Sequence, residues 1–123
     1  MREIKFRGKR KDSYNHEWVY GSYMDSYFSS RYGLVTAIFF NNYEICKTFR
    51  IPVFKNTVGQ FTGLKDKNGV EIYEGDIVYV ASEDEKAMIL WDKESARFVL
   101  QFKDWCAYFD NYYEKDLEVV GNI

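Results

Sequence analysis

The chain has 123 residues, of which 46% are hydrophobic and 20% aromatic, and its formal net charge is −2. This length suits one domain with a hydrophobic core, and the apolar content excludes an intrinsically disordered chain. Aromatic side chains suit half-buried pleated surfaces, so the composition favours sheet over helix. No apolar run approaches the roughly 20 residues that span a bilayer, and the charged N-terminus lacks a signal-peptide core. We therefore expect a single domain over residues 1–123, in the cytoplasm and without membrane contact.

The average charge hides an asymmetry along the chain. Residues 1–63 carry ten Lys or Arg against five Asp or Glu, whereas residues 64–123 carry seven against fourteen. A half at +5 is therefore joined to a half at −7. Such polarity lets copies of one protein attract each other, but it disappears if folding interleaves the two halves. Interleaving is the simpler expectation from sequence alone.

Two strands joined by a polar turn are predicted at the N-terminus. Residues 2–10 alternate charged and apolar side chains around Ile4 and Phe6, which is typical of a half-exposed strand. The aromatic segment 17–23 follows the polar turn 12–16 and predicts a second strand. Together the two strands predict an N-terminal hairpin.

The next segment combines an irregular stretch with two further strands. Residues 25–33 are rich in Ser and Tyr and are predicted to form a loop or a variable excursion. Residues 34–40 predict a buried strand, and the Asn pair at 41–42 predicts a turn before a strand over residues 44–51. Pro52 cannot donate a ladder hydrogen bond, so it ends that strand or lies at a sheet edge.

Glycines punctuate residues 58–80. Asn68-Gly69 is a strong hairpin signal because both residues tolerate positive φ, and Gly75-Asp76 predicts a second turn before a strand. The charged segment 82–86 then predicts a hairpin loop. Further strands are predicted over residues 77–81, 87–91, 97–102 and 117–123, with a strand or a short helix over 105–113.

These short strands predict an all-β fold. The meander is expected to form a small SH3-like barrel element, to which the N-terminal hairpin is added. The single proline of the chain agrees with a sheet-rich structure. Because a fold does not determine a function, this pattern predicts no activity.

Residue types that catalyse reactions are scarce. His16 is the one histidine and lies in a polar turn, where a solvated side chain is expected. Cys46 and Cys106 match neither a disulfide framework nor a zinc pattern, so we expect reduced thiols in or near the core. No serine lies in a nucleophile elbow. The sequence therefore predicts no catalytic nucleophile, no metal and no cofactor.

Oxygen ligands are the remaining candidates for a metal. Asp66 and Asn68 weakly match a calcium loop, but a leucine and a glycine then fall at positions that need side-chain oxygen. The carboxylates of Glu71, Glu74 and Asp76 lie close in sequence and form the hypothesis of a metal-dependent enzyme. A solvated acidic face is the simpler interpretation.

A basic N-terminal segment is the strongest binding candidate. It holds six positive charges in ten residues with an aromatic ring among them, as small β-barrels do where they contact phosphates and stack bases. The pI of about 5.5 opposes this, because nucleic-acid-binding domains are usually basic. An edge strand protected by charge has the same pattern, with Lys5, Arg7 and Lys9 on one outward face. The candidate nucleic-acid contacts are Arg2, Lys5, Arg7, Lys9, Arg10 and Lys11.

Five blocks of the chain resemble the YopX family and occur in the family's order. They are MREIKFRGK at 1–9, EWVYG at 17–21, TVGQFTGLKDKNG at 57–69, IYEGDIV at 72–78 and LEVVGNI at 117–123. The long central block is the most specific. The family motif, to which we assign a structural role, comprises Gly59, Gln60, Thr62, Gly63, Asp66, Asn68, Gly69, Tyr73, Glu74, Gly75 and Asp76.

The resemblance implies a phage or prophage protein with a mainly β fold, an SH3-like barrel element and no established activity. Residues 25–55 match no family block and form the expected variable segment. The sequence ends at Gly-Asn-Ile, where the resemblance implies a short acidic tail. No catalytic residue is implied. We therefore expect a non-enzymatic binding or assembly module that self-associates, with an unidentified host or phage protein as a further partner. A nucleic-acid-contacting accessory factor is the alternative.

Overall fold

The computed structural model describes residues 4–122, in which strands, turns and three short 3-10 helices are present. The predicted all-β class is confirmed. Contacts between Cα atoms divide the described residues into two compact units, 4–60 (unit 1) and 61–122 (unit 2), and the single-domain assignment stays a prediction. No helix in the described range has the length and apolar character needed to cross a bilayer.

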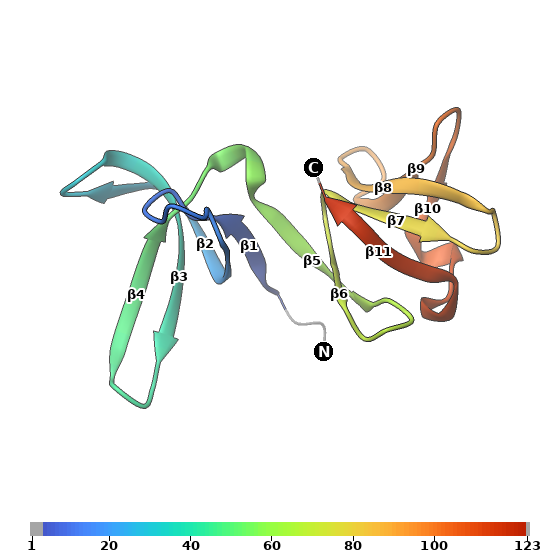
Figure 1. Cartoon of the computed structure of the whole chain (residues 1–123). Coiled ribbons are helices and arrows are strands. Elements are labelled where there is room, and N and C mark those ends of the chain that lie inside the picture. Colours follow the sequence, from blue (N-terminus) through green and yellow to red (C-terminus); the bar gives the residue numbers. More distant parts are fainter. Residues whose placement is uncertain (1–3, 123) are drawn as a thin grey trace. The chain divides into compact units, whose positions relative to one another are not determined.

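Unit 1 is an antiparallel sheet with the strand order β4-β3-β2-β1-β5 (Figure 1). Its elements are β1 (Phe6–Lys9), β2 (Trp18–Ser29), β3 (Gly33–Asn42), β4 (Lys47–Pro52), η1 (Lys55–Thr57) and the first residues of β5 (Gly59–Lys65). β1 pairs with β2 in antiparallel register, so the predicted N-terminal hairpin is confirmed. Pro52 ends β4, an edge strand of the sheet, as its missing N–H requires.

The predicted loop over residues 25–33 is wrong. β2 continues to Ser29, and the chain turns only over residues 30–32. Pairing with β3 keeps this Ser-rich stretch extended in spite of its composition, because cross-strand contacts outweigh intrinsic propensity. A register shift between Met24 and Tyr27 absorbs the irregularity, and Ser26 adopts a φ of 59° there.

The predicted turn at residues 41–42 is also wrong. Both Asn residues belong to β3, where they pair with Thr48 and Lys47 of β4. The turn follows over residues 43–46, and Cys46 supplies the positive φ, 51°, that closes it. Asn tolerates a left-handed conformation but does not require one, so the pair alone does not locate the turn.

Unit 2 contains the rest of β5, which pairs with β6, and a five-stranded antiparallel sheet with the order β10-β9-β8-β7-β11. Its elements are β6 (Glu71–Tyr73), β7 (Asp76–Val80), β8 (Glu85–Asp92), β9 (Arg97–Gln101), β10 (Cys106–Tyr108), η2 (Phe109–Asn111), η3 (Glu114–Asp116) and β11 (Leu117–Asn122). The predicted strands and hairpins of this half are confirmed within a few residues at each end. The sheet is open, with β10 and β11 at its edges, and the SH3-like barrel element stays a prediction.

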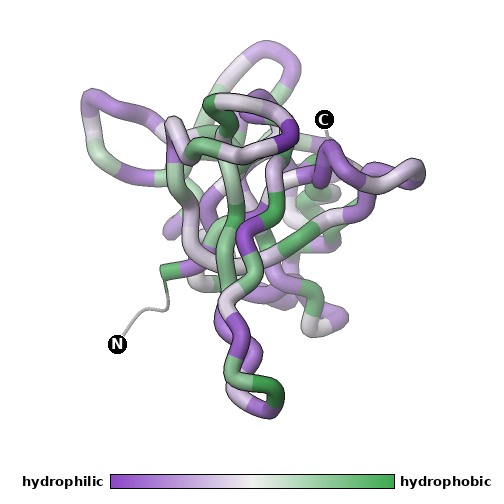
Figure 2. The backbone as a smooth tube through the Cα atoms, turned by 90° about the vertical axis from the view of Figure 1, so that its left-hand side faces the viewer, coloured by the Kyte–Doolittle hydropathy of each residue, from purple (hydrophilic) through white to green (hydrophobic). Residues whose placement is uncertain are grey.

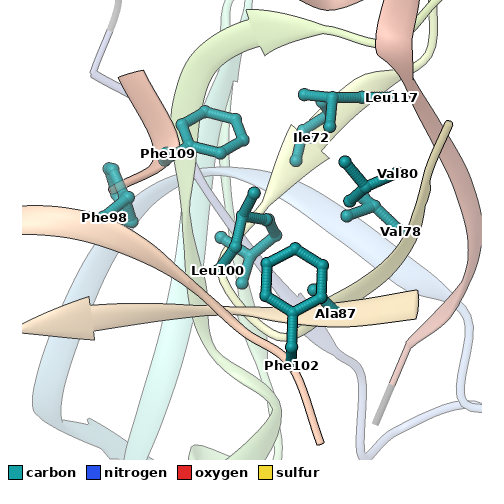
Figure 3. Close-up of a cluster of buried hydrophobic side chains, with 10 residues drawn as sticks. Ile72, Val78, Val80, Ala87, Phe98, Leu100, Phe102, Phe109 and Leu117 are labelled. Carbon is teal, nitrogen blue, oxygen red and sulfur yellow. The ribbon is translucent and has the colours of Figure 1, made fainter. Parts of the chain in front are cut away.

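Alternating side chains build the core of unit 2 (Figure 3). Along β7, Val78 and Val80 point inward and their neighbours are half-buried, as the two-residue period of a strand requires. Full burial of one such side chain stabilises the fold by about 1.5–3 kcal/mol. The cluster comprises Ile72, Val78, Val80, Ala87, Ile89, Phe98, Leu100, Phe102, Phe109 and Leu117.

Candidate functional site

The basic strand β1 does not present one outward row of cations. It lies between β2 and β5 and is not an edge strand. Arg7 is only 6% exposed, and its guanidinium carbon lies 4.1 Å from the centre of the Trp18 ring. The predicted shared outward face of Lys5, Arg7 and Lys9 is therefore wrong for Arg7, because the fold packs its guanidinium against an aromatic side chain.

Two lysines of the segment lie beside aromatic rings. The Nζ of Lys9 is 5.2 Å from the centre of the Trp18 ring, and that of Lys11 is 5.6 Å from the centre of the Phe54 ring. Lys9 is half-buried and Lys11 is exposed. These contacts place positive charge at ring faces on which a base would otherwise stack.

The remaining cations of the segment have different surroundings. Arg10 Nε donates a hydrogen bond to Asp12 Oδ1 at 2.7 Å, which lowers the pKa of Asp12. This ion pair neutralises one of the six predicted contacts. Lys5 is half-buried, and Arg2 lies outside the described residues.

The histidine and the cysteines lie at the surface. His16 is exposed in its predicted turn, and its ring packs edge-on against Phe54 with 5.0 Å between ring centres. Cys46 and Cys106 are both exposed free thiols, so the expectation of thiols in or near the core is wrong. One lies in a hairpin turn and the other in the short edge strand β10, positions that period-based reasoning cannot assign to a core.

The three neighbouring carboxylates do not gather into a metal site. Asp76 is buried, and its Oδ2 accepts a hydrogen bond from the Tyr73 N–H at 2.8 Å. Glu71 Oε1 accepts one from the Tyr73 hydroxyl at 3.0 Å, and Glu74 lies in the turn before β7. Between residues 4 and 122, no three His, Cys, Asp or Glu side chains are grouped to hold a metal ion.

Asp66 of the family motif joins two distant segments of unit 2. Its Oδ1 accepts hydrogen bonds from the N–H groups of Asn68 at 2.8 Å and Val70 at 2.9 Å, and its Oδ2 accepts one from Val119 at 2.9 Å. Burial raises the pKa of Asp66, but these hydrogen bonds outweigh burial and lower the pKa below its ordinary value. Lys67 adds an ion pair with Glu118 at 3.0 Å.

The other motif residues support the same turns. Thr62 is buried and donates its hydroxyl to the Ile72 carbonyl at 2.7 Å, across the hairpin that Asn68 and Gly69 close. Tyr73 packs its ring 5.4 Å from that of Phe61. Gly63, Gly69 and Gly75 adopt φ values of 91°, 81° and 93°.

The start of the motif lies in unit 1. Gly59 and Gln60 pair with Arg7 and Phe6, so the first residues of β5 form the antiparallel neighbour on one side of β1. All these contacts are internal to the fold. These contacts give the motif residues a structural role. That this is their sole role stays a prediction.

A depression of about 250 Å³ in unit 1 gathers side chains that no sequence motif connects. At the β2 bulge, Asp25 Oδ1 accepts a hydrogen bond from the Thr36 hydroxyl at 2.9 Å, and Lys55 Nζ lies 3.2 Å from Oδ2. Both contacts lower the pKa of Asp25. The pairing of β2 with β3 brings Asp25 and Thr36 together, and Lys55 comes from η1, later in the chain. The sequence therefore carried no signal for this group.

A larger depression, of about 440 Å³, lies beside β9 and β10 in unit 2. Asp92 at its wall accepts hydrogen bonds from the Ser95 hydroxyl at 2.6 Å and the Glu94 N–H at 3.1 Å, and both lower its pKa. The carboxylate therefore stays ionised at neutral pH. The lining residues are Asp92, Val99, Cys106, Ala107, Tyr108 and Asn111.

Comparison with known proteins decides the family. The model of the family described as YopX protein matches residues 5–123. The chain belongs to the YopX family. A crystal structure of protein EF1440 from Enterococcus faecalis has a similar fold, with a TM-score of 0.54 and 24% sequence identity over 99% of this chain and 94% of that chain. No curated protein matches the chain significantly.

The YopX match extends through both units. It includes residues 25–55, the expected variable segment, which form the end of β2, all of β3 and β4, and the start of η1. The likeness to the Enterococcus faecalis protein establishes the fold alone. A function for this YopX chain therefore has to be argued from its own charges, exposed side chains and depressions.

Proposed function

We propose that this YopX chain is a non-enzymatic binding module that associates with further copies of itself. The observation that carries this proposal is the segregation of charge. Described residues 4–60 hold nine Lys or Arg against four Asp or Glu, whereas residues 61–122 hold seven against fourteen. The two halves of the sequence fold as separate units, so each unit keeps its own sign of charge.

Exposed apolar side chains of unit 1 supply the short-range part of the association. Phe28 and Leu34 face each other across β2 and β3 and are 68% and 72% exposed, and Tyr43 and Ile45 are exposed in the next turn. Charges steer the approach of two copies, and salt screens them beyond about 8 Å at physiological ionic strength. Apolar burial then stabilises the contact.

The surroundings of the carboxylates that were candidates for metal binding or catalysis support a non-enzymatic role. Asp66, Asp76 and Glu71 accept hydrogen bonds from neighbouring backbone or tyrosine groups. The family resemblance adds a phage or prophage origin and a place in the host cytoplasm, both as parts of the proposal. A host or phage protein as the partner, in place of a second copy, corresponds to a chain that stays monomeric in the test below.

Light scattering over a concentration series at low and high salt tests the proposal. We expect a mass above that of one chain at low salt and its decrease at high salt. The double variant Lys47→Glu/Arg50→Glu, in unit 1, weakens the association because it removes exposed cations from the basic unit. The matched control Lys93→Glu/Lys103→Glu changes the net charge equally in unit 2 and retains association. A strictly monomeric chain at high concentration and low salt overturns the proposal.

The net positive charge of unit 1 also favours a second candidate, contact with nucleic acid. It predicts binding to DNA or RNA that weakens steeply with salt. Lys9→Glu/Lys11→Glu is the appropriate variant, because reversing the charge of buried Arg7 would damage the fold itself. The absence of a gel shift with either nucleic acid at low salt removes this candidate. If association in the scattering experiment requires nucleic acid, nuclease treatment abolishes it.

A further inference from the structure

The β3–β4 hairpin of unit 1 ends in a two-stranded arm. Pairing between β2 and β3 ends at Ser22 and Phe39, whereas β4 follows β3 as far as the Asn42–Lys47 pair. We call residues 40–49 the arm. The rings of Phe40 and Phe49 stack at its base with 5.2 Å between centres. An isolated two-stranded hairpin is only marginally stable in water, so the arm gains stability from any surface that covers it.

The end of the arm exposes two large side chains, Tyr43 and Ile45, on either side of the charged Glu44. Tyr43 is 83% exposed and Ile45 is 53% exposed in the turn over residues 43–46, and the thiol of Cys46 is exposed beside them. Figure 2 shows hydrophobic colouring at the end of this hairpin, at the bottom of the view. Turns favour Gly, Asn, Asp and Ser, so this turn does not follow from the needs of the hairpin. Grouped exposed apolar side chains are typical of an interaction surface.

The depression beside β9 and β10 has the size and chemistry to receive such a turn. Its volume of about 440 Å³ falls in the range of sites that enclose a small ligand or a few side chains. Val99 and Ala107 provide apolar walls, and the exposed ring of Tyr108 has the guanidinium carbon of Arg97 4.1 Å from its centre. Ionised Asp92 provides a negative wall.

We propose that the arm end of one copy occupies the β9–β10 depression of a second copy. In this contact Tyr43 and Ile45 are covered by the apolar walls, and Lys47, which follows the turn, meets the negative charge of Asp92. The basic unit of one copy thereby meets the acidic unit of the next. The inference rests on the proposed self-association and specifies the surface that it uses. Because the two surfaces differ, the contact is head-to-tail and builds a ring or an open chain.

The chain's two cysteines mark the two sides of this contact. Cys46 lies in the arm end and Cys106 lines the depression. A short bis-maleimide reagent, which adds one thiol to each of its two double bonds without an oxidant, therefore reports the contact directly. The variant Cys106→Ser keeps only the arm thiol, and Cys46→Ser keeps only the thiol of the depression.

The experiment mixes isotope-labelled Cys106→Ser with unlabelled Cys46→Ser and identifies cross-linked peptides by mass spectrometry. We expect a covalent dimer with one labelled and one unlabelled chain, joined through Cys46 and Cys106, and little dimer from either variant alone. Because each chain holds one thiol, this link cannot form within a chain. Cross-linking of a single variant with itself, to the exclusion of the mixed dimer, indicates a symmetric contact and overturns the inference.

Added substitutions show whether Tyr43 and Ile45 carry the contact. Tyr43→Ser/Ile45→Ser, in the chain that keeps Cys46, lowers the yield of mixed dimer at least tenfold. The matched control Tyr14→Ser/Tyr32→Ser removes two exposed aromatic side chains of unit 1 that lie outside the proposed contact, and it retains the dimer. Circular dichroism verifies that both variants are folded. Association by light scattering without the mixed dimer overturns this contact and leaves the proposed function standing, whereas a monomeric chain overturns both.

Discussion

The carboxylate of Asp66 holds the backbone of Val119, 53 residues further along the chain, through a hydrogen bond of 2.9 Å. The same buried side chain closes the β5–β6 turn, so one residue ties that turn to β11. The family motif is thereby connected to the last strand of unit 2.

Replacing Asp66 with Ala is expected to destabilise the protein strongly. It leaves three partly buried backbone N–H groups without their acceptor, and an unsatisfied group costs about 1–3 kcal/mol when it is buried. We expect the free energy of unfolding, measured with urea, to fall by about 3 kcal/mol or more. Asp104→Ala is the control because Asp104 is an exposed residue of the same unit. Equal effects of the two substitutions would contradict the structural role of Asp66.

The contribution of Asp66 to stability is expected to depend on pH. Its pKa is lower in the folded chain than its ordinary value of 3.8, so folding favours the ionised form. The contribution is complete above the ordinary pKa and is lost as the pH falls through the lowered pKa. We expect the difference in unfolding free energy between the wild type and Asp66→Asn to be constant near neutral pH and to shrink below about pH 4. A difference unchanged down to about pH 2 would refute this.

Gly69 and Gly121 test the need for a left-handed backbone in the Asn68-Gly69 turn. A Cβ at either position meets no atom within 4 Å, but only Gly69 has a positive φ, of 81°. We expect Gly69→Ala to lower the free energy of unfolding by about 1–2 kcal/mol, the cost of a left-handed conformation for an L-residue. Gly121→Ala should change it by less than about 0.5 kcal/mol. Thermal unfolding of both variants gives the comparison, and equal shifts would exclude backbone strain.

Arg7 and Lys9 both approach the Trp18 ring, but only Arg7 is buried. We expect Arg7→Ala to lower the free energy of unfolding by about 2 kcal/mol, and Lys9→Ala by less than about 1 kcal/mol, because a desolvated cation–π contact is the stronger one. Urea unfolding followed by tryptophan fluorescence measures both. A larger loss of unfolding free energy for Lys9→Ala than for Arg7→Ala would contradict the burial of Arg7 against Trp18.

The sequence located the strands and hairpins of unit 2 because their signals are local. Two-residue alternation distinguishes the buried from the half-buried positions of β7, and positive φ at Gly69 and Gly75 requires a residue that tolerates it. The YopX blocks could be identified from the sequence for the same reason, because each is a local pattern of residues. In unit 1 the local signals were weaker, and pairing with β3 overrode the Ser-rich composition of residues 25–29.

The candidate sites depended on contacts that alternation cannot reveal. A period of two places Lys5, Arg7 and Lys9 on one face, but it does not say that Trp18 covers Arg7. Nor does it show that Cys106 lines a depression or that Asp66 reaches Val119. Each of these facts depends on which strand lies beside which, and strand order follows from long-range packing.

By itself, the sequence determined the all-β class, the YopX family, the glycine turns and the opposite charges of the two halves. Only the tertiary structure decided that those halves fold as separate units, so that the charges stay segregated instead of interleaving. The physical reason is that the net charge of a segment depends only on which residues it contains. It is therefore the same before and after folding. The burial of a guanidinium, the reach of an arm and the lining of a depression are set by neighbours that only folding supplies.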